Sequence, residues 1–202
     1  MYRNLEVGKI VWCYYRRMNK ERGPVIMSFE NSKQHGSHHH FLAQLAGAWT
    51  GKSLTWLDPD EAPHESPVQG SFQLILDGRF ALYLYQSVMN VEPQHGMFTF
   101  GYNSQLDRCE AAWVDSFHNN TAIMYCTGGV LERGFSVTGS YPDPSGGPDW
   151  GWRTVVEVID REHLRLTAYN LSPEGVESRA VETTLTRLTQ AASAKITATY
   201  QS

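Results

Sequence analysis

The side chains best suited to chemistry in this 202-residue sequence are a few acidic, basic and imidazole groups on or beside strand-like segments. Asp115 could act as a general base with His95 or His118 as its partner, because a carboxylate and an imidazole can exchange a proton. Arg79 and Arg153 could each hold a carboxylate or a phosphate through two parallel hydrogen bonds. These residue types are compatible with hydrolase or isomerase chemistry and equally with ligand binding.

Catalytic motifs give no support for an enzyme. The sequence contains no G-x-S-x-G nucleophile elbow and no H-E-x-x-H metal motif. No P-loop is present, and the glycine pairs do not follow the dinucleotide-binding pattern. We therefore expect no cofactor, and we rank catalysis below ligand binding.

Histidine and cysteine are the remaining reactive side chains. The histidine-rich segment 34–40 could bind a transition metal, but functional metal sites usually gather their ligands from separate rigid elements. Cys13, Cys109 and Cys126 form neither a C-x-x-C pair nor a disulfide framework. We expect no metal site, and reduced thiols in a cytoplasmic protein.

The N-terminal segment differs from the rest of the chain. Residues 1–26 carry six Lys or Arg against two Glu, and their order does not fit a secretory signal. We expect residues 1–40 to form a flexible basic and His-rich arm, 41–188 a single domain and 189–202 a tail. The net charge of -4 and the absence of an apolar run near ~20 residues argue against nucleic acid and a membrane as partners.

The element pattern predicts an all-β fold. One short helix is expected over 39–46, and ten runs rich in aromatic and β-branched residues follow it. Short turns between the runs favour antiparallel neighbours, and a meander of this kind loses its exposed edges by closing into a barrel. We predict a single antiparallel barrel of ten strands, at 49–57, 67–76, 79–90, 96–103, 108–116, 121–128, 135–141, 151–160, 163–170 and 175–188.

The alternation of side chains predicts which residues line the barrel. If Asp77-Gly78 is a two-residue hairpin turn, Arg79, Tyr83 and Tyr85 share one face of their strand. The preceding strand shows polar residues on its other face, so this face is expected to point inward.

The same alternation over 108–116 places Trp113 and Asp115 inside. An interior that holds both Arg79 and Asp115 is mixed rather than purely apolar. Buried charges must be paired, solvated or bound to a ligand.

The segment 45–51 contains a G-x-W-x-G pattern at Gly47, Trp49 and Gly51. It resembles the opening of lipocalin-like and other calycin barrels, in which the Trp packs at the closed end below a short helix. The resemblance implies structural roles for these three residues.

Further motifs extend the resemblance over about 41–188. They are Asp77-Gly78-Arg79-Phe80, Gly101-Tyr102-Asn103, Trp113-Val114-Asp115-Ser116, Asp149-Trp150-Gly151-Trp152-Arg153-Thr154, Ala180-Val181-Glu182 and Arg187. In their order and spacing these motifs resemble a bacterial family of calycin-type proteins, domain of unknown function 1579, although Asn103 stands where Asp is expected. The resemblance implies a calycin-like barrel and offers no catalytic residues.

Our leading hypothesis is a barrel that binds a small, partly apolar ligand, with an anionic group as one option. Tyr83, Tyr85, Trp113 and Tyr125 would supply flat contact area, and Arg79 or Arg153 would hold an anionic group. The structural alternative is a filled core in which Arg79 pairs permanently with Asp115.

Two further alternatives stay open. An enzyme would act in the barrel mouth, and a haem-binding barrel would hold ferric haem through one axial histidine, as a related group of calycin barrels does. The candidate axial ligands are His95, His118 and His163. A homodimer is also an open alternative.

Overall fold

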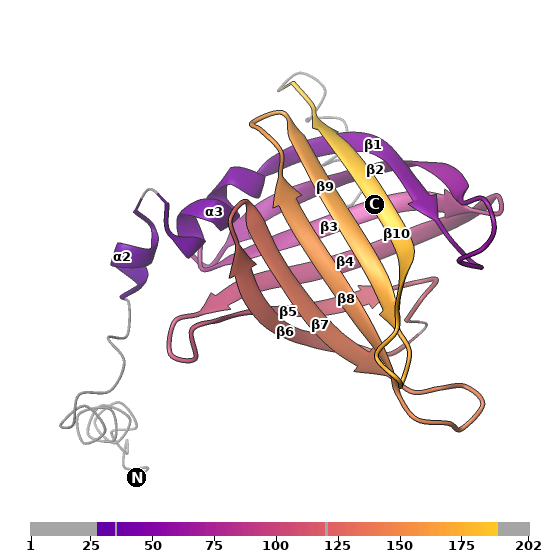
Figure 1. Cartoon of the computed structure of the whole chain (residues 1–202). Coiled ribbons are helices and arrows are strands. Elements are labelled where there is room, and N and C mark those ends of the chain that lie inside the picture. Colours follow the sequence, from indigo (N-terminus) through magenta and orange to yellow (C-terminus); the bar gives the residue numbers. More distant parts are fainter. Residues whose placement is uncertain (1–27, 35, 120, 190–202) are drawn as a thin grey trace, which may run out of the picture.

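The computed structural model describes residues 28–34, 36–119 and 121–189, which form one closed β-barrel with helical segments at one end (Figure 1). The basic segment 1–26 and the tail residues 190–202, for which we made predictions, lie outside the described residues. The helices are α2 (Phe29–Ser32) and α3 (His38–Leu45). The strands are β1 (Gly47–Thr55), β2 (His64–Ile75), β3 (Phe80–Met89), β4 (Glu92–Asn103), β5 (Arg108–Asp115), β6 (Met124–Leu131), β7 (Gly134–Tyr141), β8 (Trp150–Val158), β9 (His163–Leu171) and β10 (Glu177–Arg187).

Every strand pairs antiparallel with the next one along the chain, and β1 pairs with β10 to close the barrel. The predicted all-β fold, with ten antiparallel strands after a short helix, is confirmed. Alternation is regular where a strand divides interior from solvent, and every second residue of β5 is buried. No helix in the described part of the chain is long and apolar enough to span a membrane.

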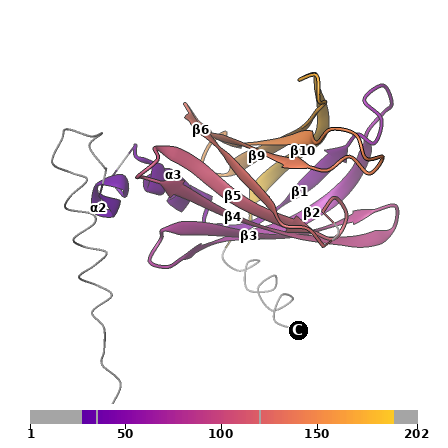
Figure 2. The same cartoon turned by 90° about the horizontal axis from the view of Figure 1, so that it is seen from below.

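The antiparallel order assigns each connection to one end of the barrel. The turns after β2, β4, β6 and β8 lie at the end that carries α3, which we call the helix end. The loops after β1, β3, β5, β7 and β9 lie at the opposite end, which we call the open end. Figure 2 shows the two helices beyond one end and the longer loops at the other.

Trp49 closes the helix end. Its indole is fully buried, and its Nε1 donates a hydrogen bond to the Leu45 carbonyl at 2.9 Å. The Arg187 guanidinium lies 4.1 Å from the centre of the Trp49 ring and donates to the carbonyls of Ala46 and Gln44. One arginine on the last strand thus fixes the end of α3 and the first strand together.

Two glycines permit this close packing. Gly47 has φ 140°, a region that L side chains rarely adopt, and a Cβ there would collide with the Arg187 guanidinium. At Gly51 a Cβ would collide with the Thr184 carbonyl on β10. At both positions a larger residue would therefore disturb the packing of the barrel.

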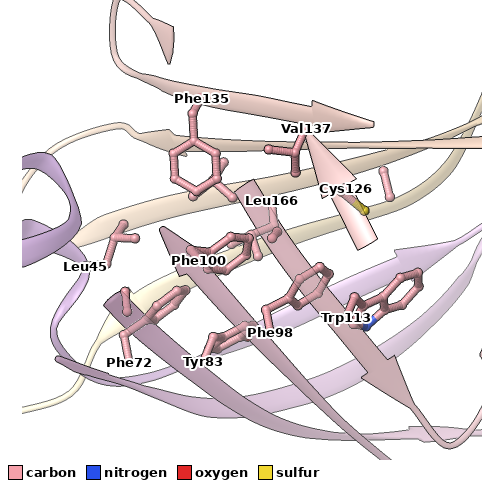
Figure 3. Packing of buried hydrophobic residues seen from close by; sticks show 14 of the residues in the cluster. Leu45, Phe72, Tyr83, Phe98, Phe100, Trp113, Cys126, Phe135, Val137 and Leu166 are labelled. Atoms are coloured by element: carbon pink, nitrogen blue, oxygen red, sulfur yellow. The ribbon is translucent and has the colours of Figure 1, made fainter. Parts of the chain in front are cut away.

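The core fills the barrel from the helix end. Figure 3 shows Leu45 near α3 and a row of aromatic rings running from it toward Trp113. The Phe98 and Trp113 rings are parallel within 1° at 5.1 Å, and Phe72 stacks on Tyr83 at 4.1 Å. Offset stacks of this kind stabilise a core beyond the area they bury.

The predicted boundary between arm and barrel, at 40/41, falls inside α3. Upstream residues also contact the barrel: the Arg79 guanidinium lies 4.2 Å from the Phe29 ring centre, and Ser32 Oγ lies 2.5 Å from His39 Nδ1. Ser32 is fully buried. Within the described residues, the folded unit therefore reaches back to α2.

Candidate functional site

The barrel interior contains a cavity of about 70 Å³ between the core and the open end. A single water molecule needs a volume of roughly 10–15 Å³, so this cavity has room for more than one water. We call it the inner cavity. One wall is aromatic, from β3–β5 and β8, and the other carries hydroxyl groups from β1 and β8–β10. Its lining includes Tyr83, Tyr85, Phe98, Trp113, Trp152, Ser53, Thr55, Thr154, Thr167 and Thr183.

A second space of about 230 Å³ lies at the open end and is lined by strand ends and by residues of the loops after β1 and β5. We call it the mouth. It shares four residues with the inner cavity: Thr55, Trp113, His118 and Trp152. These four side chains thus stand between the inner cavity and the mouth. None of the described residues lining either space is Lys, Arg, Asp or Glu.

Asp115, at the end of β5, organises the residues around this boundary. Its Oδ1 accepts hydrogen bonds from the backbone N–H groups of Phe117 at 3.1 Å, His118 at 2.5 Å and Asn119 at 3.1 Å. These bonds hold the beginning of the loop after β5 in a tight turn. The sequence Asp-Ser-Phe-His favours such a turn, because an Asp side chain readily bonds the backbone that follows it.

The other carboxylate oxygen, Oδ2, lies 3.1 Å from the Tyr85 hydroxyl, 3.1 Å from Gln94 Nε2 and 2.7 Å from His118 Nδ1. The Tyr85 hydroxyl also accepts a hydrogen bond from Trp113 Nε1 at 3.0 Å. Asp115 itself does not line the cavity, and its side chain is fully buried behind three residues that do.

The charge state of Asp115 follows from these contacts. Burial alone would raise the pKa of its carboxyl, but the hydrogen bonds from His118 and the backbone N–H groups hold that pKa below its ordinary value. Burial, together with the nearby Asp115 carboxylate, raises the pKa of the Tyr85 hydroxyl well above its ordinary value. Asp115 is therefore an anion, and Tyr85 keeps the proton it donates.

His118 is held at the boundary by its bond to Asp115. Its ring centre lies 5.4 Å from that of Trp113 and 5.3 Å from that of Trp152, and its side chain is 20% exposed. Nδ1 faces the carboxylate, and no described residue makes a hydrogen bond with Nε2. An imidazole that donates Nδ1–H to a carboxylate carries its free lone pair on Nε2.

Two polar groups on the cavity wall lack a protein partner. Trp152 Nε1 and Thr154 Oγ1 are buried and have no hydrogen-bond partner among the described residues. Both side chains come from β8 and line the inner cavity, and the residues are only 5% and 3% exposed. By contrast, Ser53 Oγ and Thr183 Oγ1 on the same cavity wall bond each other at 3.0 Å.

Four of the residues predicted from the sequence face the interior. Tyr83, Tyr85 and Trp113 line the inner cavity, and Asp115 lies directly behind its wall. The alternation argument was right for their strands because Phe72 pairs with Tyr83, as it required. Their role in binding a ligand stays a prediction.

Arg79 is a correction. The hairpin is not a two-residue turn: Ile75 pairs with Phe80, and the four residues between them form the loop. Leu76 and Asp77 have positive φ values of 51° and 59°. Arg79 therefore leaves the strand, lies half-exposed beside Asp77 and cannot pair with Asp115.

Tyr125 and Arg153 also face away from the cavity. Tyr125 is 55% exposed on the outside of β6, and its hydroxyl accepts a hydrogen bond from Arg108. Arg153 makes two 2.6 Å hydrogen bonds to the Glu177 carboxylate on the outer surface. The prediction that these side chains line the interior was wrong, because each has the opposite parity to the buried residues of its strand.

Of the three candidate histidines, only His118 lines the two spaces. His95 is exposed on β4, and His163 pairs with Asp160 at the start of β9. In the histidine-rich segment, His38 stacks on Tyr102 with ring centres 3.8 Å apart, whereas His39 is buried beside Ser32. Both adjacent imidazoles therefore have structural contacts, and both rings pack against Tyr102.

The two described cysteines are free and buried. Burial raises the pKa of the Cys109 and Cys126 thiols to about 11, so neither is a reactive thiolate. Cys13 lies outside the described residues.

Sequence reasoning missed Gln94, Trp152 and Thr154. The signal for the last two was present, because β8 alternates Trp152, Thr154 and Val156 on one face and the neighbouring Arg153 marks the other. Gln94 had no such signal, because it lies in a stretch that we expected to be a turn.

Comparison with known proteins supports the fold. Residues 34–187 match the family described as "Protein of unknown function (DUF1579)". The crystal structure of Rv2717c from M. tuberculosis has a TM-score of 0.51 at 14% identity, covering 74% of this chain and 96% of that chain. The likeness to this structure concerns the fold alone.

Two further solved structures are similar. EF1p2_mFAP2b bound to DFHBI has a TM-score of 0.42 at 13% identity, covering 75% of this chain and 100% of that one. A redesigned beta barrel, b11L5F_LGL, has a TM-score of 0.39 at 13% identity, covering 73% of this chain and 95% of that one. No curated protein matches this chain at a significant level.

Proposed function

Because this chain belongs to the DUF1579 family of proteins of unknown function, we propose its role from its own site: the barrel binds a small, planar, uncharged ligand in the inner cavity. The ligand enters from the mouth, past His118 and Trp152. The aromatic rings supply flat contact area, and the hydroxyl wall supplies hydrogen bonds.

The observation that carries this proposal is the pair of buried polar groups, Trp152 Nε1 and Thr154 Oγ1, without a protein partner. Leaving a buried donor unsatisfied costs about 1–3 kcal/mol. Ser71 Oγ also lacks a partner among the described residues but lines neither space, so the proposal rests on the place of Trp152 and Thr154 beside the inner cavity. A ligand acceptor, such as a carbonyl oxygen, would accept from the Trp152 indole.

Size and charge restrict the ligand further. The inner cavity and the mouth, about 70 and 230 Å³, are small beside the roughly 300–1,000 Å³ of drug-sized ligand pockets. The described lining has no arginine or lysine, and the Asp115 anion lies just behind the wall. The anionic option has therefore lost its support, since Arg79 and Arg153 lie on the outer surface.

The enzyme and haem-binding alternatives both depend on His118. Asp115 has a lowered pKa and its oxygens already accept several hydrogen bonds, so it is a poor general base, and the base of an enzyme would have to be His118. A haem group would likewise need His118 as its axial ligand, and the small volume of the two spaces favours a smaller molecule.

The test is a binding measurement with a matched pair of neutral probes. 1-Indanone and indane differ by one carbonyl, so we expect 1-indanone to bind more tightly, by about tenfold for one good hydrogen bond. Tryptophan fluorescence and titration calorimetry would measure both affinities, and native mass spectrometry would show any co-purifying molecule.

Trp152→Phe is the matching variant. It keeps the aromatic ring and removes the N–H, so it should abolish the preference for 1-indanone and leave indane binding unchanged. If neither probe binds at millimolar concentration and no molecule co-purifies, the barrel has a structural role and the proposal is wrong. A Soret band on haem titration that His118→Ala removes would favour the haem alternative instead.

A further inference from the structure

The His118 imidazole lines the inner cavity and the mouth, and one of its ring nitrogens, Nε2, has no partner among the described residues. Its Nδ1 lies 2.7 Å from Asp115 Oδ2, and the carboxylate is ionised, so the ring proton is on Nδ1 in the neutral imidazole. Nε2 then accepts hydrogen bonds. No described residue donates to it, although the ring lines both the inner cavity and the mouth.

The position of this imidazole is fixed by several contacts. Asp115 is anchored by three backbone N–H groups and by the Tyr85 hydroxyl and Gln94 amide, so it cannot turn away from His118. Aromatic rings flank the imidazole on the other sides. Because the imidazole cannot reorient to suit different ligands, it favours a ligand that has a hydrogen-bond donor at this position.

A matching donor lies close by. The Trp152 indole, whose Nε1–H has no protein partner, has its ring centre 5.3 Å from that of His118. One protein acceptor and one protein donor, on neighbouring rings, complement a ligand that carries a donor and an acceptor side by side. A cyclic amide has this arrangement, because its N–H and C=O are adjacent on one edge of a planar ring.

We propose that the ligand is a neutral planar ring bearing a cyclic amide, whose N–H donates to His118 Nε2 and whose carbonyl accepts from Trp152 Nε1. This inference rests on the proposed function and adds the donor to it. Asp115 is a positioning residue, because it acts on the ligand only through His118.

The test compares 2-quinolone with N-methyl-2-quinolone, which keeps the carbonyl and loses the donor. We expect wild-type protein to bind 2-quinolone about tenfold more tightly, as for one well-made hydrogen bond. Equal affinity, or tighter binding of the N-methyl compound, would overturn the inference. The proposed function would survive that result if 1-indanone still binds more tightly than indane.

Two variants separate the acceptor from its support. His118→Asn can still donate to Asp115, but its shorter amide does not reach the position of Nε2, so the preference for 2-quinolone should disappear. His118→Gln can place an amide oxygen near the position of Nε2 and should retain part of the preference. Circular dichroism confirms that each variant is folded, and an unchanged preference in folded His118→Asn would contradict the assignment.

Discussion

Individual residues at the candidate site divide into those that hold it together and those that offer a polar atom without a protein partner. Asp115 belongs to the first group: it is buried and ionised, and it bonds three backbone groups and three side chains. His118, Trp152 and Thr154 belong to the second group, because each offers a polar atom that no described residue satisfies. A buried anion with so many donors is expensive to alter, because its loss leaves those donors without their acceptor.

Asp115→Asn should destabilise the protein by about 3–5 kcal/mol at pH 7, because an amide N–H₂ would face donors that now share Oδ2. The folded-state pKa of Asp115 lies below its ordinary value of about 3.9. The ionised group's contribution is therefore complete above that ordinary pKa and is lost as pH falls through the lower folded pKa.

Urea unfolding of wild type and Asp115→Asn at pH 7 and near pH 3 measures this effect, and we expect the difference between them to shrink in acid. Asp149→Asn, at an exposed loop position, is the control and should change stability by less than about 0.5 kcal/mol. A difference that is equal at both pH values would contradict the linkage.

At the scale of elements, the contact between β1 and β10 closes the barrel. Gly51 lies opposite Leu185, and its Cα comes so near the Thr184 carbonyl that a side chain has no room. The Arg187 side chain then continues the same contact to the end of α3. Closure therefore depends on a small residue in β1 and a long one at the end of β10.

Gly51→Ala should lower the unfolding free energy by about 1–3 kcal/mol, because the added Cβ forces the two strands apart. The matched control is Gly129→Ala on β6, where a Cβ would meet open space and stability should stay within about 0.5 kcal/mol of wild type. Thermal melts compare the two. Equal melting temperatures for the two variants would mean that the closing strands tolerate the extra atom.

The elements themselves were predictable from the sequence, because each strand carries a two-residue alternation that is dictated by the division between core and solvent. The loops were less predictable. Leu76 adopts a positive φ, which its side chain disfavours, so the local sequence did not predict a four-residue turn. Because the turn was expected to have two residues, Arg79 was predicted to lie inside the barrel.

The candidate site was likewise only partly predictable from the sequence. Tyr85, Trp113 and Asp115 could be placed inside from their own strands. The sequence offered His95 and His118 as partners of Asp115, and the choice between them depends on how the loop after β5 folds back. The lack of partners for Trp152 Nε1 depends on several strands together. Such properties arise only when the barrel is closed.

At the scale of the whole molecule, the two ends of the barrel differ along its axis. The helix end is filled by Trp49, Leu45 and the aromatic core and is locked by Arg187. The open half contains the cavity, the hydroxyl wall and the loop that carries His118. The proposed function therefore assigns binding to the open half and stability to the helix end, so a cavity-wall hydroxyl without a protein partner should be removable with little effect on folding.

Two threonines on the cavity wall test this separation. Thr154→Val removes a hydroxyl without a protein partner, so stability should stay within about 1 kcal/mol of wild type while the affinity for 1-indanone falls. Thr183→Val removes a hydroxyl that bonds Ser53, which leaves the Ser53 hydroxyl unpaired and should cost about 1–3 kcal/mol.

Urea unfolding and 1-indanone titration of both variants give the answer, since Val keeps the branched shape of Thr and so preserves packing. The two variants should show opposite effects. Thr154→Val should bind 1-indanone more weakly and keep its stability. Thr183→Val should lose stability and, where it is folded, keep its affinity for 1-indanone. If Thr154→Val is as destabilised as Thr183→Val, its hydroxyl supports the fold. The polar wall is then structural, because a group kept for a ligand should not be needed for folding.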